Sequence, residues 1–524
     1  MIASCLAVVG SCGSSLPRTS PSSLPGAEIA ERSLAELRDD LAAGKTTSVA
    51  LVEAYLARIE ALDHRGPSLH AMISINPQAR AEAERLDRER KAGTLRGPLH
   101  GIPIVLKDNI ESRELPTTAG ALALEHNRTE RDAPVVGRLR AAGAIILGKT
   151  NMSEWANMRS SYSVSGWSAL GGLVRNPYAR DRSACGSSSG SAVAVAAGYA
   201  AAALGTETDG SVTCPAAFNA LVGLKPTVGL VSRAHIVPIS HSQDTAGPLT
   251  RTVTDTAILL TAMAGSDPAD AATVDADAHK RDYAADLRID AVKGTRIGVA
   301  RFLAGFHEGT DAAFERALAE LRAAGAELVE IPTFEMGDIG NGELAVLLAE
   351  FKVDLDAYLA STARTVTTRT LADVIAFQRK HADRELRIFG QDLFEKAQAT
   401  KGLDDPAYQK SLADNRRLAG RDGIDRLLRE HGVVALVAPS FSPAFTIDLV
   451  TGDHFLGGSS MLPAVAGYPH LTVPMGQVHG LPVGLSFIGP AWSESTLLSL
   501  GYAFEQRTHA RTPPTFAASA SLAP

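Results

Sequence analysis

The sequence is poor in cysteine and has no metal-binding pattern. Its four cysteines, Cys5, Cys12, Cys185 and Cys214, cannot build a disulfide framework for 524 residues, and none belongs to a CxxC pair. The 14 histidines show neither HExxH nor a repeated spacing typical of a metal centre. We therefore expect packing to supply the stability, and we expect neither a metal nor another cofactor in the site.

Long runs of one charge and long apolar runs are also missing. Lys and Arg number 51 and Asp and Glu 58, so the net charge is −7 and gives no support for a nucleic-acid partner. A long uncharged stretch, between Arg182 and Glu207, is broken by Gly and Ser. Its apolar part, 192–204, is shorter than the roughly 20 residues that a transmembrane helix needs. A hydrophobic content of 45% predicts a globular protein with a substantial core.

The N-terminus has features of an export signal. Residues 1–10 are largely apolar and uncharged, and Val9-Gly10-Ser11-Cys12 resembles a lipoprotein cleavage box, although the positive n-region is missing. A Gly, Ser and Pro-rich linker follows at 13–26. Two interpretations stay open: an exported or lipid-anchored protein, which these residues favour, and a cytoplasmic protein with an irregular N-terminus.

Helical periodicity and short apolar runs alternate along the rest of the chain. Helices are expected at 28–43, 48–62 and 77–91, and again over about 340–430, where they would form a substrate-side wall or lid. Apolar runs predict strands at 102–106, 144–147, 296–300, 327–331, 433–437, 471–473 and 483–488. Strands that alternate with helices indicate an α/β sheet with both faces covered.

Residues 143–150 match the phosphate-loop pattern GxxxxGK[ST] letter for letter. A phosphate loop needs free backbone N–H groups in a Gly-rich turn, whereas Ala144-Ile145-Ile146-Leu147 is typical of a buried strand. We therefore expect Gly143 to end a helix over 134–142, and we do not expect nucleotide binding.

A second motif, GxSxG at 186–190, matches a nucleophile elbow with Ser188 at its centre. That elbow needs a strand before it and a His and an acid after it, but 175–182 is a polar loop. His235 and His241 are the nearest candidate bases, and neither lies in a recognisable signature. The elbow is kept as a minor alternative.

Two serine-bearing turns, 185–191 and 205–211, flank an Ala-rich helix. The turn Thr208-Asp209-Gly210 can direct successive backbone N–H groups to one point, as an oxyanion requires, and would place Ser211 beside it.

A serine nucleophile needs a base, and burial can lower a lysine pKa enough to supply one. Lys107, Lys149 and Lys225 occupy similar positions at the ends of apolar runs, so spacing does not choose among them. The competing interpretation of Lys107 is an ion pair with Asp108.

Several strings closely resemble the amidase signature family: GSSSGSA (186–192), GTETDGS (205–211), CPA (214–216) and GLKPT (223–227). Four more are most similar to its bacterial peptide amidases: LHGIPIVLKDNI (99–110), LGKTNMSEWAN (147–157), SQDTAGP (242–248) and AGYPHLTVPMG (466–476). The resemblance implies one α/β domain at 28–515, with a mixed twisted sheet and the added helical segment at about 340–430. The segment 1–27 would precede it and a tail, 516–524, would follow.

The resemblance also implies a Ser-cisSer-Lys triad. Ser211 matches the nucleophile, Ser187 the bridging serine after a cis peptide bond, and Lys107 the base. The backbone N–H groups that would hold the oxyanion are those of Thr208, Asp209 and Gly210.

The chain departs from the general family pattern around the nucleophile. The family commonly has GGS there and an arginine two residues later, whereas Asp209 precedes Gly210-Ser211 here and Thr213 replaces the arginine. Both departures are like the peptide amidase branch and put a glutamyl-tRNA amidotransferase subunit in doubt.

Three functions are therefore considered. The first is a serine amidohydrolase that removes the C-terminal amide of peptides as ammonia through an acyl-enzyme on Ser211, with the amide and water as its partners. The second acts on small aliphatic, aryl or fatty amides, and the third is a non-catalytic scaffold. Cys185 and Cys214 are interpreted as small buried packing residues rather than catalytic thiols, since neither has a nearby His.

Overall fold

The computed structural model describes residues 24–521. The lipoprotein-like sequence predicted at 9–12 lies outside the described residues, and the predicted boundaries of the domain stay predictions. Between residues 24 and 521, no helix combines the length and the apolar character needed to cross a bilayer.

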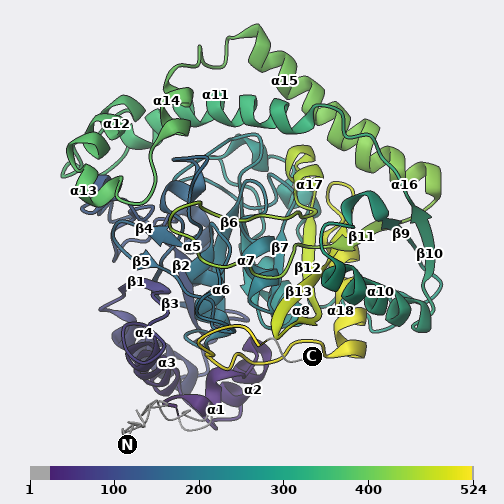
Figure 1. Ribbon diagram of the computed structural model, residues 1–524. Coiled ribbons are helices and arrows are strands. Elements are labelled where there is room, and N and C mark those ends of the chain that lie inside the picture. Colours follow the sequence, from purple (N-terminus) through teal and green to yellow (C-terminus); the bar gives the residue numbers. More distant parts are fainter. Residues whose placement is uncertain (1–23, 522–524) are drawn as a thin grey trace, which may run out of the picture.

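A mixed 11-stranded sheet runs through the molecule (Figure 1). In spatial order its strands are β1 (Met72–Ile75), β3 (Ile145–Thr150), β2 (Pro103–Lys107), β6 (Ala202–Glu207), β8 (Thr245–Thr250), β7 (Val222–Lys225), β12 (His470–Val478), β13 (Leu481–Ile488), β11 (Ala435–Pro439), β9 (Arg296–Ala300) and β10 (Glu327–Ile331). β2 is parallel to β3 and β6, and β9 is parallel to β10 and β11, whereas the other pairs are antiparallel. A separate hairpin joins β4 (Trp167–Ser168) and β5 (Gly172–Leu173).

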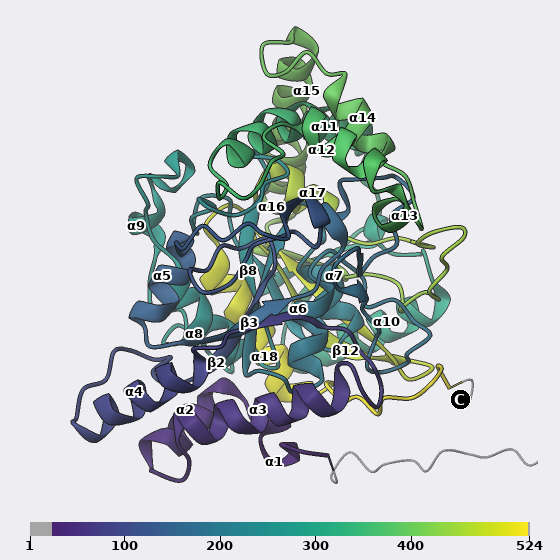
Figure 2. The same ribbon diagram turned by 90° about the vertical axis from the view of Figure 1, so that its left-hand side faces the viewer.

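The α-helices, in chain order, are α1 (Ala27–Ala30), α2 (Leu34–Ala42), α3 (Ser48–Leu62), α4 (Ala79–Lys91), α5 (Pro134–Ala141), α6 (Ser189–Ala196), α7 (Thr213–Phe218), α8 (Val253–Met263), α9 (Ala276–His279), α10 (Glu308–Ala323), α11 (Ile339–Ala360), α12 (Leu371–Lys380), α13 (Ala382–Glu385), α14 (Asp392–Gln398), α15 (Pro406–Arg416), α16 (Asp425–His431), α17 (Met461–Ala466) and α18 (Glu494–Thr508). Figure 2 shows α5 and α8 on one face of the sheet near β2, β3 and β8, and α6 and α7 on the other. The predicted α/β class, a mixed sheet covered by helices, is confirmed.

The two ends of the molecule are helical. Helices α1–α4 pack at one end, and α11–α15 form a layer at the opposite end (Figure 1, Figure 2). Between β10 and β11 every regular element of the described chain is helical, and α15 continues through a π-helical stretch, Arg417–Ile424, into α16.

The first predicted helix, 28–43, is divided in the structure because Ser33 starts a new helix. The Ser33 hydroxyl accepts a hydrogen bond from Glu36 N, and the Glu36 carboxylate accepts one from Ser33 N. This reciprocal cap fixes the start of α2 and ends α1 early. Helix α3 has the predicted bounds, whereas α4 begins at Ala79, two residues later than expected.

The Ala-rich segment contains a strand that the sequence does not predict. Helix α6 ends at Ala196, and Gly198 adopts a φ of 75° where a side chain would lie 2.8 Å from Ala30. The chain then turns into β6, which is fully buried although it begins with two alanines. Alanine and glycine are poor strand formers, so pairing with β2 and β8 determines this strand.

Candidate active site

Lys107 is the last residue of β2, and its side chain is fully buried. Its Nζ lies 2.7 Å from Ser187 Oγ, 2.8 Å from Thr206 Oγ1 and 3.2 Å from Thr206 O. The two Thr206 oxygens accept two N–H bonds, so the third position on the nitrogen faces Ser187. An uncharged Lys107 can therefore accept the hydroxyl proton of Ser187 through its lone pair.

The surroundings of Lys107 favour the uncharged amine. Burial lowers the pKa of Lys107 to about 7, and the carboxylates of Asp244 and Glu207 only partly oppose this shift. A base whose pKa lies near the working pH is unprotonated in a large fraction of the molecules and still binds a proton well enough to remove it from a hydroxyl group.

Lys149, near the end of β3, is buried in a different way. Its Nζ lies 3.2 Å from Asp108 Oδ1 and donates a hydrogen bond to Thr117 Oγ1 at 3.0 Å. Asp108 is thus the ion-pair partner of Lys149 and not of Lys107. The strand predicted inside the phosphate-loop pattern is confirmed, since Lys149 belongs to the buried β3.

Lys225, the last residue of β7, is also fully buried, and burial lowers its pKa to about 8. Its Nζ donates a hydrogen bond to Pro226 O at 3.3 Å. Of the three lysines named from the sequence, Lys107 alone lies within hydrogen-bond distance of a serine hydroxyl in the described part of the chain.

The peptide bond between Gly186 and Ser187 is cis, and Ser187 is completely buried. The neighbouring Ser188 faces another way, because its Oγ donates to Thr206 O at 3.1 Å and accepts from Thr206 N at 3.2 Å. Within residues 24–521 no histidine hydrogen-bonds to Ser188, and His241 instead pairs with Asp354 at 2.9 Å. The elbow alternative therefore lacks its base.

Ser211 lies next to the segment that carries Ser187. The backbone N–H of Ser188 donates to Ser211 O at 3.2 Å, which joins the two serine turns. Glu207 fixes the residues after the nucleophile, since its Oε2 accepts hydrogen bonds from Val212 N and Thr213 N at 2.8 Å each. The carboxylate thereby holds the start of α7 in place.

The turn between Glu207 and Ser211 presents free donors. Among the described residues, no hydrogen bond uses the backbone N–H of Thr208, Asp209 or Gly210. Gly210 has a φ of 75°, a conformation that glycine adopts without strain, and a Cβ there would lie 3.1 Å from Ser460 Oγ. The three groups predicted from the sequence are thus available to bind an oxygen atom.

Two cavities lie beside this turn. The first, of about 290 Å³, touches Gly186 before the bridging serine and Asp209 and Gly210 in the turn. Its lining residues are Asn157, Ser165, Cys185, Gly186, Asp209, Gly210, Cys214, Phe441, Phe445, Asp453, Phe455, Gly458, Ser460 and Met461. We call it the serine cavity, because it contacts both serine turns.

The second cavity, of about 410 Å³, lies on the Thr206 side of the turn. Helix α11 contributes Asp354, Ala357 and Tyr358 to its wall. The serine cavity, by contrast, has no lining residue from 340–430 in the described chain. The predicted wall segment therefore borders the larger cavity, and two loops, 157–165 and 441–461, border the serine cavity instead.

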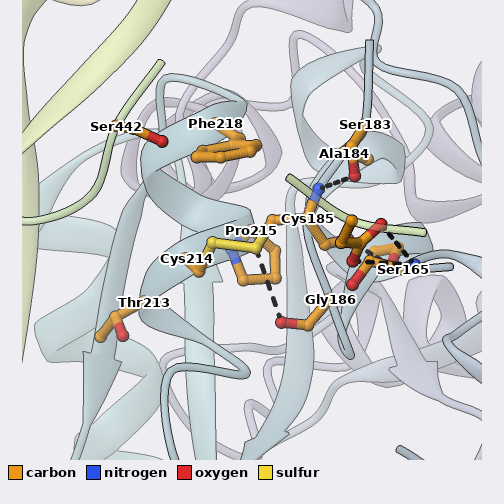
Figure 3. The surroundings of a disulfide bond; sticks show 12 residues. Ser165, Ser183, Ala184, Cys185, Gly186, Thr213, Cys214, Pro215, Phe218 and Ser442 are labelled. Carbon is orange, nitrogen blue, oxygen red and sulfur yellow. Dashed lines mark hydrogen bonds between the residues drawn. A yellow bond between two sulfur atoms is a disulfide. The ribbon is translucent and has the colours of Figure 1, made fainter. Parts of the chain in front are cut away.

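Cys185 and Cys214 form a disulfide with their Cα atoms 5.9 Å apart (Figure 3). Both are buried, as expected of packing residues, but the bond between them is not predicted, because spacing along a sequence does not reveal which cysteines meet in space. Cys185 lies just before the Gly186–Ser187 bond, and Cys214 lies in α7 just after Ser211. The bond therefore connects the first serine turn covalently to the helix that follows the second.

Two residues of the site, Thr206 and Asn109, are not predicted from the sequence. Thr206 receives two hydrogen bonds from Lys107, and Asn109 Nδ2 donates to Thr206 Oγ1 at 3.0 Å. Both lie inside strings that carry the family resemblance, so inspection of the neighbours of Lys107 could have found them.

Comparisons with known proteins show the family to which the chain belongs. The family model Amidase matches residues 50–498. A probable amidase of Arabidopsis thaliana is 41% identical over 94% of this chain and 92% of its own. A putative amidase of Arthroderma benhamiae is 38% identical over 89% and 80% of the two chains. The solved peptide amidase of Stenotrophomonas maltophilia is 52% identical over 93% of this chain and 99% of its own, with a TM-score of 0.88.

The chain belongs to the amidase family. It is a hydrolase that acts on the C–N bond of amides.

Proposed function

We propose that this amidase hydrolyses the C-terminal primary amide of peptides to the free acid and ammonia. The observation that carries the chemistry is the 2.7 Å contact between Lys107 Nζ and Ser187 Oγ, made by a buried lysine that forms no ion pair with any residue of 24–521. The similarity to the solved peptide amidase supports the substrate class.

The first half of the reaction forms an acyl-enzyme. Ser211 Oγ attacks the amide carbon while its proton passes to Ser187, whose own proton passes to Lys107. The N–H groups of Thr208, Asp209 and Gly210 hold the developing oxyanion. The relay then returns a proton to the nitrogen, the C–N bond breaks, and ammonia leaves.

The second half repeats these steps with water as the nucleophile. Water gives a proton to the same relay and attacks the ester carbon, and Ser211 regains its proton as the ester bond breaks. No step requires a group beyond the chain, the amide and water.

The function is tested with the purified full chain and an amidated dipeptide. We expect release of ammonia and the free acid without added metal or nucleotide. Hydrolysis of acetamide-like or fatty amides alone would instead favour the second function considered from the sequence.

The assignment of the nucleophile has its own test. Ser211→Ala should abolish labelling by a serine-directed phosphonate probe, whereas Ser188→Ala should retain it. Labelling that persists in Ser211→Ala and disappears in Ser188→Ala would restore the elbow alternative.

We also propose that the protein works outside the cytoplasm, exported or lipid-anchored. The Cys185–Cys214 disulfide supports this, because such bonds persist in oxidising compartments. Cell fractionation of the full chain, with alkylation of free thiols, should find it in the envelope with this bond formed. A cytoplasmic protein with both thiols free would contradict the proposal.

A further inference from the structure

The serine cavity carries charge of only one sign. Asp209 and Asp453 are the charged residues of its wall, and no Lys, Arg or His lines it in the described part of the chain. Phe441, Phe445 and Phe455 supply apolar surface. Charges interact more strongly in such a partly enclosed space than in bulk water.

Asp209 lies in the turn that would hold the oxyanion. Its Oδ1 is buried and has no hydrogen-bond partner among the described residues. Burial raises the pKa of Asp209 to about 6; a hydrogen bond from Ser460 and the charge of Lys225 oppose the shift, and Glu207 adds to it. Above neutral pH, this carboxylate is ionised in the wall of the serine cavity.

Asp453 is the second carboxylate of the wall. The backbone N–H of Ser165 donates to both of its oxygens, at 3.1 and 3.2 Å, which fixes the side chain against another lining residue. Burial raises its pKa, and the neighbouring His454 opposes this shift. The orientation of the carboxylate is thus set by the protein before any substrate binds.

The nearby charged groups do not cancel the field of the two carboxylates. The charge of Lys225 acts on Asp209, but Lys225 is not part of the cavity wall. Glu343 of α11 also faces Asp209, and burial together with the Asp209 charge raises the pKa of Glu343, which favours its neutral form. A substrate in the serine cavity therefore experiences a negative potential.

We infer that Asp209 and Asp453 are specificity-determining residues that select peptide amides by charge. Amides of cationic and neutral C-terminal residues are accepted, and amides of acidic residues are disfavoured. The same field repels the carboxylate product, which is formed beside Asp209. This inference rests on the proposed function.

Matched substrates separate charge from shape. N-acetyl-alanyl amides of arginine and citrulline have nearly the same size, as do those of glutamate and glutamine. At pH 8 the kcat/KM should be about tenfold higher for arginine than for citrulline, and about tenfold higher for glutamine than for glutamate. Chromatography of the acid product keeps the side-chain amide of glutamine out of the measurement.

Variants identify the source of the preference. Asp453→Asn and Asp209→Asn should each lower both ratios about threefold, because each removes one negative charge from the cavity wall. A general loss of rate in a variant does not affect a ratio, since both substrates are measured with the same enzyme. Asp290→Asn is the matched control, since it removes one negative charge from an exposed position outside the cavity. It should leave both ratios unchanged.

Product inhibition gives an independent readout. Acetyl-alanyl-glutamine, the acid product, should inhibit the native enzyme weakly and Asp209→Asn at least threefold more tightly. A merely structural role of Asp209 would not tighten the binding of the product.

The outcomes are distinguishable. Ratios within twofold of one in the native enzyme, or ratios that neither variant changes, would overturn the inference while peptide amide hydrolysis still holds. Failure to hydrolyse any of the four amides would overturn the proposed function and the inference with it.

Discussion

Lys107 and Lys149 lie near the ends of neighbouring parallel strands, and both are buried, yet their surroundings differ. In the β2–β3 ladder Leu106 is opposite Lys149 and Lys107 is opposite Thr150. Lys149 has the carboxylate of Asp108 at 3.2 Å, whereas Lys107 has hydroxyl and carbonyl oxygens. A carboxylate favours the ammonium form and neutral oxygens favour it less. The contacts therefore distinguish the two lysines, since Lys149 forms an ion pair with Asp108 and Lys107 lies beside the Ser187 hydroxyl.

Removal of the Lys107 amine should have the largest effect, and the effect should be on the rate. Lys107→Met deletes the base, so kcat for an amidated dipeptide should fall roughly 10³–10⁴-fold while the circular dichroism spectrum stays native. Steady-state kinetics with the acid product as readout checks the loss. A variant that kept a tenth of the native rate would show that Lys107 is not the base.

Lys149→Met should act on stability rather than on chemistry. It leaves the buried Asp108 carboxylate without its partner, which should cost about 3–5 kcal/mol of unfolding free energy. Urea unfolding measures the loss, and the double variant Asp108→Asn/Lys149→Met is the control that should recover much of it. Normal unfolding combined with a rate as low as that of Lys107→Met would transfer the role of base to Lys149.

The two lysines also illustrate which features of the site can be predicted from the sequence. The run before Lys107 predicts a buried strand end, and the structure has one. Lys149 and Lys225 also follow apolar runs, so this pattern does not single out Lys107. Only the three-dimensional arrangement places Asp108 beside Lys149 and Ser187 beside Lys107. The family resemblance identifies Lys107 as the base because the whole string around it matches the family. The local pattern around Lys107 does not differ from the patterns around the other two lysines.

The fold was predictable where apolar periodicity is strong. Strands β9 and β10 have the predicted bounds, whereas β1, β6, β7 and β8 are not predicted at all. β8 contains Gly247 and Pro248, and β6 contains alanines and a glycine, so their place in the sheet depends on neighbours that the sequence does not reveal. The Cys185–Cys214 bond was missed for the same reason, since it joins segments 29 residues apart.

The pH dependence of kcat/KM should show a smaller effect, which reports the pKa of Lys107. Because the uncharged Lys107 is the active form, kcat/KM should fall about tenfold per pH unit below its pKa of about 7. Asp244 favours the charged lysine, so Asp244→Asn should shift the inflection to lower pH. Rates measured from pH 5 to 9 check both statements, and an inflection that Asp244→Asn leaves in place would contradict this account of the Lys107 pKa.

Linkage between protonation and folding gives the smallest expected effect and the most direct measure of the Lys107 environment. The pKa of Lys107 is about 7 in the folded chain and about 10.4 in an unfolded one, so between these values the unfolded state binds the additional proton. Native stability should therefore rise with pH across this window, by at most about 1.4 kcal/mol per unit, relative to Lys107→Met, which lacks the group. Urea unfolding of both proteins at pH 7 and pH 9 measures the difference. A difference that stays constant would mean that Lys107 remains charged when buried, as an ion-paired lysine would, and the contrast between the two strand ends would disappear.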